Sequence, residues 1–182
     1  MYKILITGGS GFIGTHISLL LLERGYKLVI LDSLINSSDN VLKKILRILK
    51  EKNLNCESKI DFYKGDLRDK FILGKIFLDA LRTGSKIDGV IHLAGLKSVK
   101  ESNLNPLDYW KVNVTGSISL IEIMQKYECR KLIFSSSASI YGDSEDIPFD
   151  ENTRPKPLNP YTNTKLTVET FLKDIHKTNP SN

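Results

Sequence analysis

A tyrosine and a lysine stand four residues apart at the start of the last amphipathic segment. In the sequence PYTNTK they are Tyr161 and Lys165, and this spacing puts both on one face of a helix. A tyrosine is ordinarily a poor base at neutral pH, but a nearby ammonium favours its phenolate form. The pair therefore indicates a general base that takes a proton from a hydroxyl group. The same spacing also arises by chance on helix surfaces, so this interpretation needs support from other residues.

A run of hydroxyl side chains precedes this pair. The stretch SSSASIYG covers Ser135–Gly142 and contains Ser137 and Ser139, but neither an aspartate nor a glutamate. Ser137 closes a predicted strand, where its hydroxyl would lie beside the phenol of Tyr161. A serine, a tyrosine and a lysine that converge in this way indicate a catalytic group rather than surface decoration.

A glycine-rich turn near the N-terminus indicates a nucleotide site. In TGGSGFIG, the residues Gly8, Gly11 and Gly14 follow an apolar run at spacings of three and three. Such glycines allow a tight turn, close approach of the backbone to a pyrophosphate and close packing of the helix on the strand. The N–H groups of a helix that begins near Phe12 and Ile13 would point at the phosphates. A glycine-rich turn alone is weak evidence, but its place between a first strand and a helix supports a nucleotide.

Two aspartates close the next two predicted strands. Asp32 stands 24 residues after Gly8, where a carboxylate can accept both hydroxyls of an adenosine ribose and would repel a 2′-phosphate. It therefore favours NAD over NADP, although a helix cap or a turn would also use an aspartate here. Asp66, in KGDL, is a candidate acceptor for the adenine amino group and equally a candidate turn residue.

The elements that must position these residues alternate along the chain. Apolar runs that end in small or polar residues predict buried parallel strands over 2–7, 27–32, 59–66, 88–95 and 130–137. Helical periodicity predicts helices over roughly 12–24, 39–52, 69–82, 107–127 and 160–178. The alternation predicts an α/β fold with a Rossmann-type, doubly wound parallel sheet, whose ligands bind at the carboxyl ends of the strands. The long irregular stretch 142–159 is of the kind that serves a site.

Composition narrows the class further. The chain of 182 residues is long enough for one domain with a core, and its net charge of +5 suits an anionic ligand and is compatible with a nucleic acid as well. The densest basic run, 41–52, reads as the solvated face of an amphipathic helix. There is no signal-peptide pattern and no apolar run long enough to span a bilayer, and Cys56 and Cys129 lack metal-ligand spacing. We expect a cytoplasmic protein with no metal, no nucleic-acid partner and no membrane partner.

Taken together, the motifs resemble those of the extended short-chain dehydrogenase/reductases. TGGSGFIG, Asp32, GDL, HLAGLK, YWKVNVTGS with Asn113, FSSSASIYG and PYTNTK occur in the family's order and cover the chain from end to end. Most of these motifs mark only the superfamily. The segments AGLK, with Lys97, and LDSLINSS are most similar to those of the UDP-glucose 4-epimerases.

This resemblance implies a reaction and a set of residues. NAD would take the C4 hydride of UDP-galactose or UDP-glucose and return it to the other face through a 4-keto intermediate. Tyr161 would be the base, assisted by Ser137 and Lys165, and the substrate would contact Lys97, Ser137, Ser139 and Tyr161. The residues expected to bind NAD are Gly8, Gly11, Phe12, Ile13, Gly14, Asp32, Ser33, Leu34, Asn36, Ser37, Asp66, Leu67, Leu93, Ala94, Gly95, Lys97, Asn113, Ser135, Tyr161 and Lys165.

The absence of an acidic residue from the serine run discriminates among the reactions of this family. Related dehydratases and decarboxylases carry an acid one or two residues beyond the serine equivalent to Ser137, where this chain has Ala138 and Ser139. Without such an acid, dehydration and decarboxylation are disfavoured, and we expect the reaction to be removal and return of a hydride. Two departures from the family pattern are Lys100, in place of a small residue, and Leu93, in place of an aromatic one.

The family also implies more protein than these 182 residues. Its members are roughly twice this length and carry a C-terminal UDP-sugar-binding domain. We therefore expect residues 1–182 to be a truncated NAD-binding Rossmann domain without its last strands, inactive alone, and the whole protein to be a homodimer. Two alternatives stay open. One is a short NAD-binding regulatory or partner-binding protein without turnover, and the other is a different extended dehydrogenase/reductase acting on a UDP-sugar.

Overall fold

Five parallel strands form one sheet in the first of the two units into which the protein divides. The computed structural model describes residues 1–38, 40–143 and 147–178. The first unit comprises residues 1–94 and 119–134, and the second comprises residues 95–118 and the described part of 135–182. The described strands of the sheet are β1 (Lys3–Thr7), β2 (Lys27–Asp32), β3 (Ile60–Lys64), β4 (Gly89–His92) and β5 (Leu132–Phe134).

The strands stand in the order β3-β2-β1-β4-β5, and every pair of neighbours is parallel. Between β3 and β4 the chain crosses to the other side of β1, so the direction of winding reverses there. Thr7, at the end of β1, is in register with Leu31 of β2 and His92 of β4. In sheets of this topology the ligand crevice lies at the carboxyl ends of the strands, beside the reversal point. The carboxyl ends of β1, β2 and β4 are therefore the part of this unit to search for a site.

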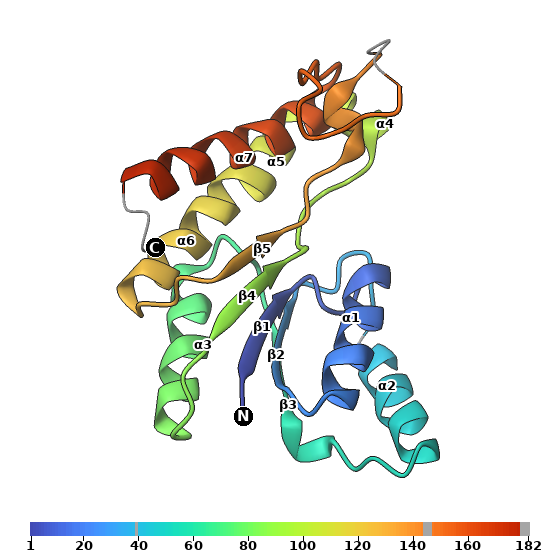
Figure 1. Ribbon diagram of the computed structural model, residues 1–182, viewed down its shortest axis with the longest axis vertical. Coiled ribbons are helices and arrows are strands. Elements are labelled where there is room, and N and C mark those ends of the chain that lie inside the picture. The colour runs from blue at the N-terminus through green and yellow to red at the C-terminus, as the bar shows by residue number, and fades with distance from the viewer. Residues whose placement is uncertain (39, 144–146, 179–182) are drawn as a thin grey trace. The chain divides into compact units, whose positions relative to one another are not determined.

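Helices cover both faces of this sheet, as expected for a doubly wound fold. α1 (Phe12–Glu23) and α2 (Asn40–Glu51) lie on one face, and α3 (Lys70–Arg82) lies on the other (Figure 1). α3 packs beside the end of α6 (Gly116–Lys126), where Phe77 stacks on Tyr127 with ring centroids 5.3 Å apart. α6 begins in the second unit and ends in the first.

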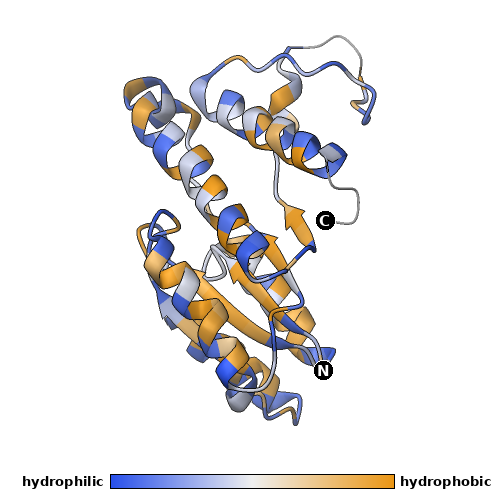
Figure 2. Ribbon diagram, turned by 90° about the vertical axis from the view of Figure 1, so that its left-hand side faces the viewer, coloured by the Kyte–Doolittle hydropathy of each residue, from blue (hydrophilic) through white to orange (hydrophobic). Residues whose placement is uncertain are grey.

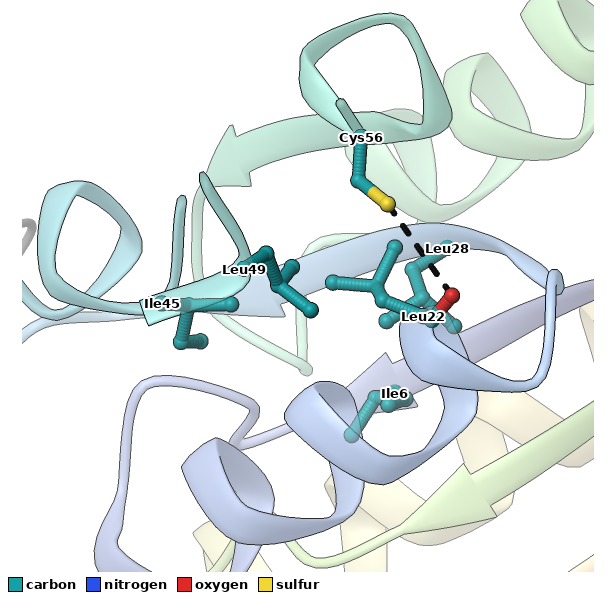
Figure 3. Packing of buried hydrophobic residues seen from close by; sticks show 6 residues of the cluster. All are labelled: Ile6, Leu22, Leu28, Ile45, Leu49 and Cys56. Atoms are coloured by element: carbon teal, nitrogen blue, oxygen red, sulfur yellow. Dashed lines mark hydrogen bonds between the residues drawn. The ribbon is translucent and has the colours of Figure 1, made fainter. Parts of the chain in front are cut away.

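The core of the first unit follows from the apolar runs of its strands. Every residue of β2 after Lys27 is buried, because a strand inside a parallel sheet is covered on both faces. Figure 2 shows the strands as the most hydrophobic elements of this unit. On the face covered by α1 and α2 a cluster forms, and the Cys56 thiol in it faces the carbonyl oxygen of Leu22 at 3.9 Å (Figure 3). The fully buried members of this cluster are Ile6, Leu22, Leu28, Ile45, Leu49 and Cys56.

The second unit is made of helices and one long irregular segment. Its short helices are α4 (Val99–Leu104) and α5 (Pro106–Tyr109), followed by a π-helix, η2 (Trp110–Thr115), that leads into α6. A 3₁₀-helix, η3 (Ala138–Tyr141), precedes the irregular segment, and α7 (Pro160–Thr178) ends the described chain. α7 packs against α4, α5, η2 and η3 of its own unit.

The predicted elements are confirmed, but several of their bounds need correction. The strand predicted over 59–66 covers Ile60–Lys64. The strand predicted over 130–137 ends at Phe134, and the strand predicted over 88–95 ends at His92. These predictions were too long because they included the small and polar residues that follow each strand and lie in the connecting loops. The helix predicted over 107–127 is interrupted by the π-helix, and α4 was not predicted at all. The start of α2 was predicted at residue 39, which lies outside the described residues.

Candidate functional site

The glycine-rich turn joins β1 to α1 in the geometry that a phosphate-binding turn requires. Gly8 has a φ of +70°, its N–H donates to the Leu31 carbonyl at 2.8 Å, and a Cβ built on it would lie 2.7 Å from the Ala94 nitrogen. Only glycine fits there. Gly11 differs, because its φ is −74° and the nearest atom to an added Cβ is the Gly8 carbonyl oxygen at 3.3 Å. The φ of Gly11 suits any residue, and an added Cβ would make one tight contact, with that carbonyl oxygen, so the lack of a side chain here fits close approach of a ligand to the backbone.

The first turn of α1 presents its N–H groups at this turn. Gly11 is the N-cap and contributes no side-chain hydrogen bond, and the first turn holds no acidic residue. Phe12 and Ile13 are exposed, and Gly14 packs directly on the backbone of Gly8. Uncapped N–H groups and the positive end of the helix dipole favour an anion at this position.

Asp32 is the centre of a hydrogen-bond network at the end of β2. One carboxylate oxygen accepts from the Leu34 N–H at 2.9 Å and from the Ser37 hydroxyl at 2.8 Å. The other oxygen accepts from the Ser10 N–H at 2.9 Å, which ties the glycine-rich turn to the loop after β2. A carboxylate has about four acceptor positions, so one position is left for a ribose hydroxyl, and a second hydroxyl requires Ser37 to turn away. Sequence reasoning did not identify Ser10 as the donor.

The remaining predicted contacts in this loop surround Asp32. Leu34 adopts a left-handed φ of +61°, which aims its N–H at the carboxylate. Ser33 is half-buried and Asn36 is exposed. The loop is thus shaped around Asp32 and leaves exposed polar groups at its rim.

Asp66 has a partner that sequence reasoning missed. Its two carboxylate oxygens accept from the Arg68 side chain at 2.9 and 2.6 Å, and from the Arg68 N–H at 2.8 Å. The hydrogen bonds from Arg68 lower the pKa of the Asp66 carboxyl, although burial opposes them. An adenine amino group would have to share this carboxylate with Arg68. Leu67, beside it, is buried.

The segment after β4 is pinned to the end of β1. The Leu93 N–H donates to the Thr7 carbonyl at 3.0 Å, and the Thr7 hydroxyl shares a hydrogen bond of 2.6 Å with Nδ1 of the buried His92. Ala94 donates its N–H to the same hydroxyl at 3.4 Å. These bonds hold Leu93 and Ala94 against the glycine-rich turn. All the predicted contacts from Gly8 to Ala94 therefore lie along the carboxyl ends of the strands in the first unit.

The predicted catalytic residues belong to the second unit. Tyr161 is half-buried in the first turn of α7, and no group of its own unit hydrogen-bonds its phenol among the described residues. Lys165 is 6% exposed, and its ammonium donates to the Ser135 carbonyl at 2.8 Å. Burial lowers the pKa of Lys165 to about 8. The lysine is thus a buried cation one helical turn from the phenol of Tyr161.

Asn113, at the centre of the π-helix, holds the start of this unit. Its carboxamide oxygen accepts from the Leu96 N–H at 2.8 Å, and its nitrogen donates to the Leu96 carbonyl and to the Thr164 hydroxyl, each at 3.0 Å. Both N–H donors are used within the protein, so Asn113 forms a clamp that joins the backbone at Leu96 to Thr164 of α7. Gly95 lies against this clamp, since an added Cβ would stand 3.0 Å from the Asn113 oxygen and 3.8 Å from the Lys165 ammonium.

The two serines of the hydroxyl run bond to each other. The Ser137 and Ser139 oxygens lie 2.7 Å apart, and Ser137 also caps η3 by accepting from the Ser139 N–H at 3.3 Å. Ser137 is half-buried and Ser139 is exposed, as is Lys97. The hydroxyl of Ser136 is buried without a hydrogen-bond partner among the described residues. The stretch offers hydroxyl groups and no carboxylate, as the sequence indicated.

The described part of the chain contains neither a cluster of metal ligands nor a helix suited to a membrane. No group of three or more histidine, cysteine, aspartate or glutamate side chains among residues 1–38, 40–143 and 147–178 is arranged to hold a metal ion. None of the described helices is long and apolar enough to cross a bilayer.

Nearly the whole chain matches one known family. Residues 5–181 match the family model described as GDP-mannose 4,6 dehydratase. The chain belongs to this family. The family assignment agrees with the Rossmann-type sheet and with the order of its motifs.

Two of the similar curated proteins are UDP-sugar epimerases by name. The UDP-glucose 4-epimerase of Yersinia enterocolitica is 47% identical over 179 residues, which are 98% of this chain and 50% of that protein. The bifunctional UDP-glucose 4-epimerase and UDP-xylose 4-epimerase 1 of Pisum sativum is 44% identical over 98% of this chain and 49% of that protein. These relatives confirm the resemblance drawn from the motifs, and the chain spans about half the length of the curated relatives it matches.

A solved structure supports the same relationship. The UDP-glucose 4-epimerase of Bifidobacterium longum, in complex with NAD⁺ and UDP, matches with a TM-score of 0.89 and 37% sequence identity. The match covers 98% of this chain and 50% of that one. The fold described above is therefore the fold of about half of that enzyme.

Proposed function

We propose that the protein is a UDP-glucose 4-epimerase that interconverts UDP-galactose and UDP-glucose with the help of NAD. The observation that carries this proposal is a set of groups within the second unit: the phenol of Tyr161, the buried ammonium of Lys165 one helical turn away, and the paired hydroxyls of Ser137 and Ser139. These groups can transfer one proton and bind an oxygen, and the stretch from Ser135 to Gly142 contains no carboxylic acid. The bound NAD⁺ and UDP of the Bifidobacterium longum enzyme support this assignment.

The first unit fits the cofactor. Gly11, which has no side chain, and the uncapped start of α1 suit a pyrophosphate, and Asp32 keeps one acceptor position for a ribose hydroxyl. The buried carboxylate also repels a 2′-phosphate, which favours NAD over NADP. When bound, NAD supplies reversible acceptance of a hydride, the step that no side chain of this protein can perform.

The chain's own residues handle the proton and the oxygen. Tyr161 takes the proton from the sugar 4-hydroxyl as C4 is oxidised, and gives it back when C4 is reduced on the opposite face. The positive charge of Lys165 stabilises the phenolate during this exchange. Ser137 donates a hydrogen bond to the same sugar oxygen, and Ser139 orients the Ser137 hydroxyl. Lys97, exposed on the segment after β4, is in our proposal a cation for the substrate.

Dehydration is the main rival reaction, because the matching family model is described as a dehydratase. Loss of water from a sugar needs a general acid for the leaving hydroxyl. At the two positions beyond Ser137 this chain has Ala138 and Ser139, neither of which is such an acid. A second alternative is an NAD-binding protein without turnover, and the intact set of Ser137, Tyr161 and Lys165 speaks against it.

One assay separates these functions. The whole protein is incubated with NAD and UDP-galactose, and the products are identified by mass and by NMR of the sugar. The epimerase yields UDP-glucose at unchanged mass, a dehydratase yields a product lighter by one water, and a binding protein yields no product. Only the first outcome is compatible with the proposal.

Three further expectations stay proposals. We infer that residues 1–182 are the NAD-binding part of a longer protein with a separate UDP-sugar-binding domain, as the half-length match to the relatives supports. We infer a cytoplasmic location, which two buried free cysteines support. Light scattering on the whole protein tests the expected homodimer.

A further inference from the structure

The ring of Tyr161 meets a second tyrosine of the same unit edge-on. Tyr109, the last residue of α5, lies with its ring centroid 6.4 Å from that of Tyr161, and the two ring planes are 81° apart. This is the edge-to-face arrangement that aromatic pairs prefer. Tyr109 is 1% exposed, so one face of the Tyr161 environment is a buried, fixed aromatic ring.

Tyr109 is itself anchored at its far end. Its hydroxyl donates to the Ser98 carbonyl oxygen at 2.7 Å, and Ser98 caps α4 by accepting from the Glu101 N–H at 3.3 Å. Burial raises the pKa of the Tyr109 phenol, so it remains a neutral hydrogen-bond donor. A ring held by its neighbours and by its hydroxyl cannot rotate out of the contact without losing this bond.

We propose that Tyr109 is a positioning residue that holds the phenol of Tyr161 at the angle required for proton transfer. The inference rests on the proposed function, in which Tyr161 is the base. The backbone of Tyr161 is already fixed, because its carbonyl accepts from the Thr164 hydroxyl at 2.6 Å and Thr164 is clamped by Asn113. The side-chain torsions of Tyr161 are the freedom that remains, and the contact with the ring of Tyr109 restricts them.

The same contact relates Tyr161 to the segment that carries Lys97. Leu96, on one side of Lys97, is held by Asn113, and Ser98, on the other side, is held by Tyr109. Both of these residues also contact α7: Asn113 donates to the Thr164 hydroxyl, and the ring of Tyr109 contacts the ring of Tyr161. Tyr109 therefore relates the phenol of the base to the backbone after Lys97, while Asn113 relates α7 to the backbone before it.

The test compares three variants of the whole protein. Tyr109→Leu removes the ring, and Tyr109→Phe keeps the ring but removes the hydroxyl. Tyr127→Leu is the matched control, because Tyr127 also stacks on an aromatic ring and donates its hydroxyl to a backbone carbonyl, that of Gly74 at 3.3 Å, in the first unit. For each variant, kcat, KM for UDP-galactose and the dissociation constant of NAD are measured.

We expect Tyr109→Leu to lower kcat roughly tenfold to a hundredfold, since small misplacements of a catalytic group have effects of this size. The KM and the NAD dissociation constant should change by no more than about twofold, which a purely structural defect would not preserve. Tyr109→Phe should retain most of kcat, and Tyr127→Leu should retain it as well. An unchanged kcat in Tyr109→Leu, or an equal loss in Tyr127→Leu, overturns the proposal.

A measurement on the unaltered protein keeps the proposal falsifiable if Tyr109→Leu does not fold. In protein with labelled tyrosines, NMR should detect nuclear Overhauser contacts between the ring protons of Tyr109 and Tyr161, with resonances assigned from Tyr161→Phe and Tyr109→Phe. Their absence overturns the positioning role. The proposed function fails separately, if Tyr161→Phe retains full turnover.

Discussion

The ammonium nitrogen of Lys165 lies 2.8 Å from the carbonyl oxygen of Ser135, in a position where the lysine is 6% exposed. The bond ties α7 to the first serine of the hydroxyl run. Burial is also the reason that the pKa of Lys165 falls to about 8. The site thus holds a cation that the fold would accommodate more easily as a neutral amine.

The first prediction concerns stability and pH. The unfolded chain keeps its lysine protons to about pH 10, whereas folded Lys165 loses its proton near 8. Between these values the unfolded state binds more protons, so the contribution of Lys165 to the free energy of unfolding rises with pH, by roughly 2–3 kcal/mol. Below pH 8 the folded state carries the full cost of the buried charge. Urea unfolding from about pH 7 to about pH 10 should show this rise in the parent protein and not in Lys165→Met. Parallel pH curves for the two proteins would refute it.

The second prediction distinguishes the structural role of Gly8 from the proposed ligand-binding role of Gly11 in the same turn. Gly8→Ala should reduce the free energy of unfolding by about 2–4 kcal/mol, because its φ is left-handed and the new methyl meets Ala94. Gly11→Ala should cost less, about 1 kcal/mol, because its φ of −74° suits alanine and its methyl meets the Gly8 carbonyl oxygen at 3.3 Å. It should nevertheless weaken NAD binding roughly tenfold or more, since the methyl projects where we propose that the pyrophosphate approaches the backbone. Urea unfolding and titration with NAD measure the two effects. Gly74→Ala, in an open helical position, is the control. Tight NAD binding by Gly11→Ala would place the pyrophosphate elsewhere.

The third prediction concerns cofactor choice. Asp32→Ala should narrow the preference for NAD over NADP, because it removes the charge that repels a 2′-phosphate. It should also lower the free energy of unfolding by about 1–3 kcal/mol, since the buried N–H of Ser10 and the N–H of Leu34 lose their acceptor. The ratio of the two dissociation constants, measured by fluorescence titration, isolates recognition from general destabilisation. An unchanged ratio would mean that Asp32 is structural only.

The fourth prediction compares how much Ser137 and Ser139, which hydrogen-bond to each other, contribute to kcat. Ser137→Ala should lower kcat by roughly a hundredfold, in the range seen when one hydrogen-bond donor to a reacting oxygen is removed. Ser139→Ala should lower kcat less, by roughly threefold to tenfold, because Ser139 acts through the Ser137 hydroxyl. Steady-state rates of the whole protein measure both. A larger loss for Ser139→Ala than for Ser137→Ala would reverse their roles.

The sequence predicts the central strands of the sheet well because they are buried on both faces. In KLVILD the four residues between the lysine and the aspartate are all apolar, and the structure confirms the segment as β2, with those four residues buried. α7 begins at Pro160, as its proline predicts, since proline is favoured in the first turn of a helix. Periodicity and helix-start signals are local, so they can be read without knowledge of the rest of the chain.

The parts that escaped prediction depend on geometry that periodicity does not encode. The π-helix around Asn113 adds residues to a turn without changing the apolar pattern, so it reads as ordinary helix. α4 has a capping serine, Ser98, with Glu101 three residues later, but six residues are too few for a periodic signal. The contact of Tyr109 with Tyr161 joins residues far apart in the chain. Long-range pairs of this kind follow only from the fold.

The candidate site was likewise predictable in part. Residue types predicted the glycine-rich turn, Asp32 and the Tyr161–Lys165 pair, which the structure places on the expected elements. The sequence did not show which side chains of the protein already hydrogen-bond to the predicted ligand-binding groups. Arg68 already binds the carboxylate of Asp66, and Ser37 already binds Asp32. Such partners are set by side-chain directions, which short motifs leave undetermined.

The most direct test of the proposed function is the rate of UDP-galactose to UDP-glucose conversion by the whole protein and its Tyr161→Phe variant, with bound NAD quantified in both. We expect the parent to form UDP-glucose, and Tyr161→Phe to bind NAD equally well while losing at least a hundredfold in turnover, the range of a lost general base. No conversion by the parent, or undiminished conversion by Tyr161→Phe, would contradict the proposed function.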